Sequence, residues 1–353
     1  MEQVVILGGG VAGMQTAAAL SDLGIKSVII EKQSELGGKV KTYDKIFPFF
    51  QSGKEIVKYL ESKLQSSSLI NIKTGTEISS VTGSAPDFQV RLTADSQRIP
   101  AQAIVVATGF EPFDASLQEE YGYSVYPNVI TATEMEHMLD FESDTHGELT
   151  RPSDGKPAKR VAMIFCAGSR SEKLGHNYCS RICCSFTIKQ AIEIKERRPD
   201  AWVTCFYIDI RTYGRGFEEM YRKAQELGIK FIRGRVAECG MLPNGDITLK
   251  AEDTIQGKPI RGTFDLVSLS TGMTPCVDAV KLMRILGIRV DEDGFFTSID
   301  TETQPNISSR EGIFLAGAVT GLKPIPDCIS DGNAVAAKVA GFIKTQVVPQ
   351  GFV

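Results

Sequence analysis

"QVVILGGGVAGMQTAAALSDLG", residues 3 to 24, is the stretch that decides the fold that this sequence predicts. Its first five residues form an apolar run that fits a buried parallel strand. The glycines Gly8, Gly10 and Gly13 then follow in G-x-G-x-x-G order, and helical periodicity continues to the end of the stretch. A strand, a glycine-rich turn and a helix in this order predict the first part of a Rossmann-type dinucleotide-binding unit.

Each residue of this pattern has its own physical role at a pyrophosphate. Gly8 permits the tight turn, Gly10 lets the backbone approach the pyrophosphate, and Gly13 lets the helix pack closely on the strand. The next apolar run, "SVIIEK" at 27–32, predicts a second strand, and its Glu31 lies 18 residues after Gly13. We expect this carboxylate to bind the ribose hydroxyls, so the full context of a dinucleotide fingerprint is present.

A second pair of glycines indicates which dinucleotide is bound. Gly37 and Gly38 follow the acidic residue in "EKQSELGGKV", which resembles the second glycine pair of FAD-binding flavoprotein disulfide reductases. "AIVVATGFEP", residues 103–112, resembles the strand end that places Thr108 and Gly109 near the cofactor in those flavoproteins. FAD is therefore favoured over NAD.

The C-terminal part of the chain adds further cofactor contacts. "EGIFLAGAVTG", residues 311–321, resembles the last FAD motif of these flavoproteins, but Ala318 replaces their ribityl-binding aspartate. Ile325 and Pro326 begin a predicted helix whose N-terminal N–H groups would stabilise negative charge at the N1/C2 carbonyl edge of a reduced flavin. A plain packing helix is the alternative. We expect FAD to contact Gly8, Gly10, Val11, Ala12, Gly13, Glu31, Lys32, Gly37, Gly38, Lys39, Val40, Ile78, Thr108, Gly109, Phe110, Gly317, Ala318, Ile325 and Pro326.

A second series of strand and helix patterns predicts a second domain of the same kind. The turn-rich segment "TRPSDGKPAKR", residues 150–160, precedes a new strand, and alternating patterns continue to "DLVSLSTG", residues 265–272. The sequence thus predicts an α/β protein with two Rossmann-like domains, in a layout that resembles thioredoxin reductase. Residues 1–155 and 273–353 are expected to form the FAD-binding domain and residues 156–272 the inserted domain.

Four cysteines stand where the inserted domain of thioredoxin reductase would hold NADPH. The strand "VAMIFC" runs into "AGSRSEKLGHNYCSRICCSF", where the glycine-rich pyrophosphate turn is missing. Cys166, Cys179, Cys183 and Cys184 have the spacing C-x12-C-x3-C-C, so four thiolates can converge on one inorganic centre. Such thiolates suit a zinc ion or a 4Fe-4S cluster, and unligated thiols are the third alternative. The lack of C-x2-C knuckles and the adjoining flavin domain favour iron–sulfur.

Taken together, these motifs resemble HdrA of heterodisulfide reductase and its HdrA-like relatives. The resemblance covers nearly the whole chain and is carried by "GGGVAGMQ", "ATGFEPFDA", "YGYSVYPNVITATEME", "CAGSR", "YCSRICC", "FYIDIRTYGRGFEEMY" and "GIFLAGAVTGLKPIPDCI". It implies a thioredoxin-reductase-like core with FAD, and a 4Fe-4S cluster held by the four cysteines named above. It also suggests that Lys189 approaches the flavin N5 edge, where a positive charge would favour reduced forms. A solvated helix lysine is the alternative for Lys189.

The resemblance is to short members of this family. Longer HdrA proteins carry ferredoxin-type C-x2-C-x2-C-x3-C motifs and cysteines after "DKIFP", which this sequence lacks. The short HdrA-like subunits of sulfur-oxidising or sulfate-reducing organisms imply electron transfer between FAD, one cluster and partner subunits in sulfur or energy metabolism, with a homodimer as the assembly. A stand-alone NAD(P)H-dependent disulfide reductase and an FAD-binding scaffold with structural zinc are the alternatives.

Composition restricts the partners of this 353-residue chain. A net charge of −4 without a dense Lys/Arg block favours neither nucleic acid nor anionic lipid. The sequence lacks a signal peptide and any run of about 18 apolar residues, so we expect a cytoplasmic protein without direct membrane insertion. In a reducing compartment, clustered cysteines indicate metal or redox chemistry rather than disulfides. The scattered cysteines are expected to be small buried side chains: Cys205, Cys239, Cys276 and Cys328.

Overall fold

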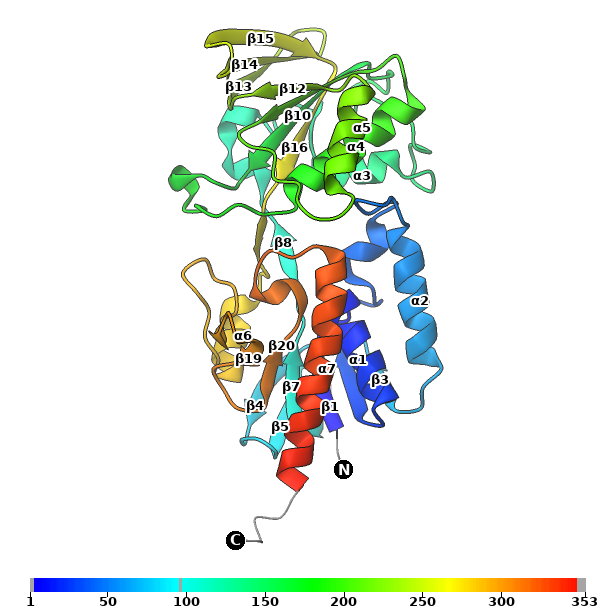
Figure 1. Ribbon diagram of the computed structural model, residues 1–353, viewed down its shortest axis with the longest axis vertical. Coiled ribbons are helices and arrows are strands. Elements are labelled where there is room, and N and C mark those ends of the chain that lie inside the picture. Colours follow the sequence, from blue (N-terminus) through cyan, green and yellow to red (C-terminus); the bar gives the residue numbers. More distant parts are fainter. Residues whose placement is uncertain (1–2, 95–96, 348–353) are drawn as a thin grey trace. The chain divides into compact units, whose positions relative to one another are not determined.

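The computed structural model describes residues 3–94 and 97–347, and its chain divides into two compact units (Figure 1). The first unit consists of Met1–Lys41, Lys54–Glu111 and Thr274–Val353. The second unit consists of Thr42–Gly53 and Pro112–Met273.

The first unit is built on a seven-stranded sheet. Its central strand β1 (Gln3–Leu7) pairs in parallel with β2 (Lys26–Ile30) and β7 (Ala103–Val106). Residues 4–7 and all of β7 are buried, which explains why these strands are continuous apolar runs in the sequence. The strand order is β18 (Ser298–Asp300), β19 (Gln304–Ser308), β20 (Ile313–Leu315), β7, β1, β2 and β3 (Ile70–Lys73), and β19 is antiparallel to both of its neighbours.

Two helices of the first unit pack closely against each other. These are α1 (Val11–Asp22) and α7 (Ile325–Val347). A Cβ atom built on Gly332 of α7 would lie 2.9 Å from the carbonyl oxygen of Ala12, so glycine is needed for this approach. The remaining elements of this part are α2 (Gly53–Gln65), α6 (Ala279–Leu286), η1 (Gly38–Thr42), η5 (Gly317–Thr320) and an antiparallel sheet of β4 (Ile78–Thr82), β5 (Phe88–Leu92) and β6 (Arg98–Ala101).

The second unit contains a five-stranded parallel sheet. Its order is β12 (Lys230–Arg233), β11 (Trp202–Tyr207), β10 (Arg160–Ala167), β16 (Leu266–Thr271) and β9 (Val129–Thr131). Its helices are α3 (Ala132–Leu139), α4 (Cys183–Arg197) and α5 (Phe217–Glu226). An antiparallel sheet of β13 (Val236–Met241), β14 (Ile247–Asp253) and β15 (Lys258–Phe264) is added. Short elements are η2 (Ala115–Leu117), η3 (Glu119–Tyr121), η4 (Glu172–Leu174) and the paired strands β8 (Phe110–Pro112) and β17 (Met273–Pro275) near the unit boundary.

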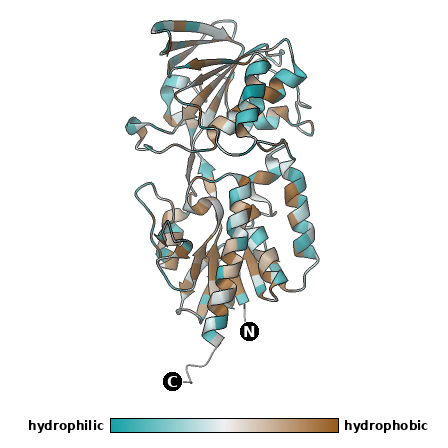
Figure 2. Ribbon diagram, viewed as in Figure 1, coloured by the Kyte–Doolittle hydropathy of each residue, from teal (hydrophilic) through white to brown (hydrophobic). Residues whose placement is uncertain are grey.

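Both faces of the five-stranded sheet are covered by apolar side chains. Met163 and Phe165 of β10 belong to one hydrophobic cluster with residues of α3, α4 and α5. The alternate residues Ala162 and Ile164 belong to a second cluster with residues of β14 and β15. Figure 2 shows apolar residues concentrated on the strands and a mixture of polar and apolar residues along α2 and α5. Within the described residues, no helix combines the length and apolar character needed to cross a membrane.

The predicted fold class, two Rossmann-like domains in an α/β protein, is confirmed, whereas the observed division of the chain differs from the predicted one. The main segment of the second unit starts at Pro112, not at residue 156. The unit also includes the separate segment 42–53. The reason is tertiary pairing, because β9 extends the second sheet beside β16. The turn-rich segment 150–160, where the sequence predicted a boundary, lies inside this unit.

A network of arginine and aspartate side chains fixes that turn-rich segment. Arg151 Nη1 lies 2.9 Å from Asp246 Oδ1, and its Nη2 donates to the carbonyl oxygen of Asn244 at 2.6 Å. Arg160 Nη2 lies 2.8 Å from the other carboxylate oxygen of Asp246. The side chains of Arg151 and Asp246 are 10% and 9% exposed, so this pair is largely withdrawn from water.

We expect Arg151→Met to lower the free energy of unfolding by an amount on the order of 2 kcal/mol, because it leaves a buried carboxylate with one cation fewer. Urea unfolding followed by circular dichroism would measure this. Lys156→Met is the matched control, since the Lys156 side chain is 74% exposed and its pairing with Asp154 is solvated. Equal effects of the two substitutions would contradict the structural role of Arg151.

Candidate functional site

The turn between β1 and α1 contains two glycines that the chain's own packing requires. Gly8 has a φ of 106°, and a Cβ atom there would lie 2.5 Å from the carbonyl oxygen of Ala107. A Cβ atom on Gly13 would lie 2.0 Å from the carbonyl oxygen of Gly8. Both residues therefore have the roles predicted for them, in the turn and in helix–strand contact.

Gly10 differs from these two glycines. Its φ is −74°, which suits any residue, and among the described residues no atom outside its chain neighbours lies within 4 Å of a Cβ built on it. Packing thus gives no reason for glycine at this position. Open space next to a glycine at the start of a helix fits close approach by an anionic group, which the helix N-terminus stabilises.

Glu31 is held against the same turn. Its Oε2 accepts a hydrogen bond from the backbone N–H of Gly9 at 2.6 Å, and its Oε1 accepts one from Gln33 at 2.8 Å. The residue is only 8% exposed. Because a carboxylate can accept about four hydrogen bonds, two acceptor positions remain for ligand hydroxyl groups.

The second glycine pair lies against the first glycine motif. The backbone N–H of Gly37 donates to the carbonyl oxygen of Gly9 at 2.8 Å. A Cβ atom on Gly38 would lie 3.3 Å from Gly10 Cα, and both Gly37 and Gly38 have positive φ, 97° and 54°. Two motifs separated in the sequence therefore meet at one turn.

The other residues predicted around FAD fall into two groups. Thr108 Oγ1 lies 3.3 Å from Cys276 Sγ, Gly109 has a φ of 72°, and Lys39 Nζ lies 5.5 Å from the ring centre of Phe110. The remaining residues are placed by the packing of the first unit. Val11 and Ala12 lie at the start of α1, Lys32 pairs with Asp278 at 3.4 Å, Val40 is buried in η1, Ile78 lies in the core, and Ile325 and Pro326 lie at the start of α7.

Asp331 is a residue near this site that sequence reasoning missed. Its Oδ2 accepts a hydrogen bond from the backbone N–H of Gly317 at 3.1 Å and pairs with Lys323 Nζ at 2.5 Å. The buried Ala318 provides no carboxylate, but Asp331 of α7 brings one to the neighbouring backbone. The only signal in the sequence is an acidic residue in the second turn of a predicted helix, which does not specify its partner.

Cys166 lies in a β-bulge at the end of β10. Ile164 pairs with Leu269 and Ala167 with Thr271, so Phe165 and Cys166 together oppose one residue of β16. Cys166 has a φ of 60°, which is uncommon for a residue with a side chain. A hydrogen bond with Cys183, together with the charges of Arg170 and Arg235, lowers the pKa of the Cys166 thiol to about 7. The bulge thus brings a strand-end cysteine to the cysteines of α4.

Cys183 and Cys184 are the first two residues of α4, and both are buried. The side chains of Cys183 and Cys166 interact, and this hydrogen bond raises the pKa of Cys183. Cys184 Sγ lies 3.6 Å from the carbonyl oxygen of Asp209. The hydrogen bond with Cys183 lowers the pKa of Cys184, so Cys184 is the one of the two whose thiolate is favoured.

Cys179 belongs to the loop between β10 and α4. Its Sγ accepts a hydrogen bond from the backbone N–H of Arg181 at 3.4 Å. In residues 3–94 and 97–347, no three or more His, Cys, Asp or Glu side chains are grouped closely enough to hold a metal ion. The structure therefore connects Cys166, Cys183 and Cys184 through side-chain interactions, but it does not gather the four predicted ligands into one ready site.

The loop that carries Cys179 is fastened to the second unit by buried polar contacts. The hydroxyls of Ser169 and Ser180 lie 2.7 Å apart, and Gly168 N donates to Gln118 Oε1 at 2.7 Å. Tyr178 Oη donates to the carbonyl oxygen of Met273 at 2.9 Å. A long ordered loop thus occupies the place at which a Rossmann domain has its short glycine-rich turn.

The four scattered cysteines are not among the predicted ligands, although Cys205 belongs to the same buried cluster as Cys166 and Cys184. Cys205 and Cys276 are buried, as predicted, and burial raises the pKa of each thiol. Burial also raises the pKa of Cys328 to about 11 and that of the half-buried Cys239 to about 12. All four are therefore protonated, unreactive thiols near neutral pH.

Comparison with known proteins agrees with this description. Residues 1–136 match the family described as pyridine nucleotide-disulphide oxidoreductase. T. acidophilum thioredoxin reductase superposes with a TM-score of 0.66 at 18% identity, covering 97% of this chain and 99% of that one. Lactococcus lactis thioredoxin reductase gives a TM-score of 0.64 at 17% identity, covering 98% and 100%. At such low identity these structures show the fold alone.

Curated relatives are more similar in sequence. The A subunit of the H(2):CoB-CoM heterodisulfide,ferredoxin reductase of Methanothermobacter thermautotrophicus is 32% identical, with 96% of this chain and 63% of that protein covered. The iron-sulfur A subunit of the CoB–CoM heterodisulfide reductase of Methanocaldococcus jannaschii is 33% identical, with 95% and 63% covered. The chain thus spans less than two thirds of the length of these relatives. Because the match extends over 96% of its own length, the chain belongs to the family of heterodisulfide reductase A subunits.

Proposed function

We propose that this chain is an FAD- and iron–sulfur-containing electron-transfer subunit of a heterodisulfide reductase-like complex. The observation that carries the proposal is the group of Cys166, Cys183 and Cys184 at the turn where the second Rossmann-like unit would otherwise hold a nicotinamide dinucleotide. In this proposal the thiolates hold an iron–sulfur cluster that relays electrons, where a bound nicotinamide would otherwise donate hydride. Bound FAD exchanges electrons singly or in pairs, and a 4Fe-4S cluster carries one at a time.

The first unit contains residues that fit FAD. Gly10 leaves open space at a helix N-terminus, and Gly38 lies against it, so both backbones are accessible to a pyrophosphate. Glu31 retains acceptor positions for ribose hydroxyls because its two observed partners are backbone N–H groups. Asp331 orients the Gly317 backbone, which supports placing the flavin end of the cofactor beside η5 and the start of α7.

The second unit contains a donor set that fits an iron–sulfur cluster. Thiolates are the usual ligands of such clusters, and three thiols already interact between the β10 bulge and the N-terminus of α4. Cys179 is the fourth ligand in this proposal. Its inclusion requires the loop 168–182 to adjust on cluster binding, with the Cys179 thiol exchanging its contact with Arg181 for iron.

The proposed partners follow from the relatives. Those relatives are named as A subunits of heterodisulfide reductases, which supports further subunits as partners of this chain. A homodimer and a role in sulfur metabolism remain predictions of the sequence resemblance, and a cytoplasmic location remains a prediction of the sequence. The same holds for the role of Lys189 at the flavin N5 edge.

Lys189 and two glutamates form a buried group of charges in the second unit. The side chains of Lys189, Glu136 and Glu193 are 0%, 1% and 1% exposed. Lys189 Nζ forms an ion pair with Glu136, donates to the carbonyl oxygen of Lys45 at 3.0 Å, and lies 3.7 Å from Glu193 Oε2. One lysine faces two carboxyl groups, so this group is neutral only when one carboxyl holds a proton.

Glu193 is the carboxyl group that we expect to take up this proton as the pH falls through neutral. Burial raises the pKa of Glu193 to about 7. Neither of its carboxyl oxygens has a hydrogen-bond partner in the described part of the chain. The two glutamates were missed in the sequence because nothing in it indicates that they meet Lys189.

We expect Gly10→Val protein to be purified with at least tenfold less FAD per chain than the wild type, because the valine side chain fills the space proposed for the pyrophosphate. Absorbance at 450 nm and release of flavin by heating would measure this. Gly341→Val is the matched control, since Gly341 in α7 also lacks positive φ and faces no atom within 4 Å among the described residues. Full flavin content in Gly10→Val protein would place the pyrophosphate elsewhere.

We expect each of Cys166→Ser, Cys179→Ser, Cys183→Ser and Cys184→Ser to lose most of the iron and acid-labile sulfide, since a serine hydroxyl is a poor ligand for iron. FAD content should stay normal. Cys205→Ser is the control, with normal iron and a stability loss on the order of 1–3 kcal/mol from its buried hydroxyl.

Analysis of anaerobically purified protein for iron, sulfide and zinc separates this function from the alternatives. Zinc without sulfide would support the scaffold with structural zinc. Neither metal, together with rapid flavin reduction by NADPH, would support a stand-alone disulfide reductase. Cluster loss in Cys205→Ser but not in Cys166→Ser would change the ligand set.

We expect the stability of the wild type to fall between about pH 4.5 and 7, because folded Glu193 retains a proton that the unfolded chain releases. Glu193→Gln removes this part of the pH dependence, so the variant should become more stable than the wild type above pH 7, by an amount on the order of 2 kcal/mol. Lys189, Glu136, Lys45 and Arg197 are the charged groups that act on Glu193.

Urea unfolding between pH 5 and 8 would measure this difference. Glu196→Gln is the control on the same helix, since it makes the same chemical change at a side chain that is 40% exposed. If Glu193→Gln were destabilising throughout the range, the ionised carboxylate would be the stabilising form and the proton assignment would be wrong.

A further inference from the structure

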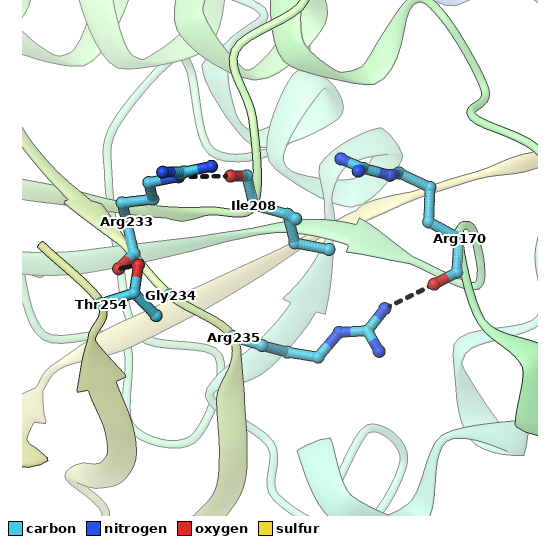
Figure 3. A pocket seen from close by; sticks show the side chains of 6 residues that line it. All are labelled: Arg170, Ile208, Arg233, Gly234, Arg235 and Thr254. Atoms are coloured by element: carbon cyan, nitrogen blue, oxygen red, sulfur yellow. Dashed lines mark hydrogen bonds between the residues drawn. The ribbon is translucent and has the colours of Figure 1, made fainter. Parts of the chain in front are cut away.

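A cavity of about 550 Å³ lies in the second unit, at the carboxyl edge of its parallel sheet (Figure 3). The residues that line it come from segments that follow or end strands β10, β11, β12 and β14. In open α/β sheets, ligands bind outside the carboxyl ends of the strands, and this volume suits a small molecule. The lining residues are Arg170, Ile208, Arg233, Gly234, Arg235 and Thr254.

The cavity carries an excess of positive charge. Three of its six lining residues are arginines and none is acidic. Asp209 is the carboxylate paired with them, at 2.8 Å from Arg170 Nη2 and 3.2 Å from Arg233 Nη2. Three guanidinium charges against one carboxylate leave two positive charges at the cavity.

The arginine side chains are held in place by backbone contacts. Arg233 Nε donates to the carbonyl oxygen of Ile208 at 3.1 Å, and Arg235 Nη2 donates to that of Arg170 at 3.0 Å, as the dashed lines in Figure 3 show. The Arg170 side chain is held by Asp209, at 2.8 Å from Nη2, and by the Cys166 thiol. Fixed guanidinium groups with unused N–H donors form a preorganised anion site, since each guanidinium has five donors.

We propose that this cavity binds a small molecule that carries a phosphate group. Guanidinium groups bind tetrahedral oxyanions through paired N–H donors, and three of them surround the cavity here. Ile208 gives the carbon part of the ligand an apolar contact. The cavity is separate from the glycine turn of the first unit, so it is a second ligand site on the chain.

The cavity is also linked electrostatically to the cysteine group. The hydrogen bond with Cys183 has the largest effect on the pKa of Cys166, and the charges of Arg170 and Arg235 lower this pKa further. A bound dianion would offset these charges and make reduction at the neighbouring centre less favourable. This consequence rests on the proposed iron–sulfur cluster, whereas binding in the cavity does not.

The test is calorimetric titration of the full anaerobic protein with pyrophosphate and with inorganic phosphate at constant ionic strength. We expect pyrophosphate to bind the wild type, and Arg233→Gln and Arg235→Gln each to weaken its binding at least tenfold. Thr254→Asp keeps all three arginines and places a carboxylate at an exposed position of the cavity, so it should abolish binding, and circular dichroism would check that loss of the hydrogen bond from Thr254 Oγ1 to the Arg233 carbonyl oxygen leaves the fold intact. Arg261→Gln is the control, because it removes the same charge from an exposed position on β15 of the same unit.

Absence of pyrophosphate and phosphate binding to the wild type would overturn the proposal. Equal weakening by Arg261→Gln and the cavity variants would also overturn it, because the effect would then reflect overall charge. Potentiometric titration of the cluster signal is the second measurement, with a lower reduction potential expected when pyrophosphate is present. If pyrophosphate binds but no cluster signal exists, the phosphate site stands and the proposed cluster fails.

Discussion

The close backbone contact between Gly13 and the carbonyl oxygen of Gly8 sets the position of α1 on β1 in the first unit. A side chain at Gly13 would place a carbon atom 2.0 Å from that oxygen, so the helix can approach the strand only with glycine there. Other contacts depend on this placement. Gly332 of α7 meets α1 at the carbonyl oxygen of Ala12, and Gly37 joins the turn through a backbone hydrogen bond. The glycine-rich turn of the candidate dinucleotide site is thus positioned by close backbone contacts.

The second unit uses the same strand-to-helix junction in a different way. Its central strand ends in a bulge at Cys166, and residues 168–182 form a loop before α4 begins at Cys183. The parallel sheet still directs its carboxyl edge to this junction, so the position of a site is preserved. What changes is the chemistry, because sulfur atoms replace a backbone cradle. One topology therefore carries a glycine-rich turn in one unit and a cysteine-bearing loop in the other.

The sequence predicted those features whose signal is local, whereas partnerships between distant residues were missed. Buried strands such as β1 and β10 are continuous apolar runs, and the glycine spacing alone located the first turn. The antiparallel strands β13 and β15 were missed because their burial does not alternate, and β14 between them was missed although its burial does alternate. The start of the second unit was also missed, since β9 has three residues and finds its partner β16 far along the chain. Asp331 and Glu193 were missed because each interacts with a residue that is distant in the sequence, Gly317 for Asp331 and Glu136 for Glu193. Hydrophobic periodicity does not indicate such interactions. The four cysteines were identifiable because their clustering in the sequence is itself unusual, although their spacing does not reveal which of them interact in the structure.

The left-handed backbone conformation of Cys166 affects which residues this position would accept during evolution. A residue with a side chain at φ 60° costs roughly 1–2 kcal/mol relative to glycine, which adopts this conformation freely. Measured by backbone conformation alone, glycine would therefore be the better residue at the bulge. The buried side chain of Cys166 offsets part of this cost through its packing, and a lineage that no longer used the thiol would be free to place another residue there. A cysteine retained there against the preference of the backbone is a marker of continued use.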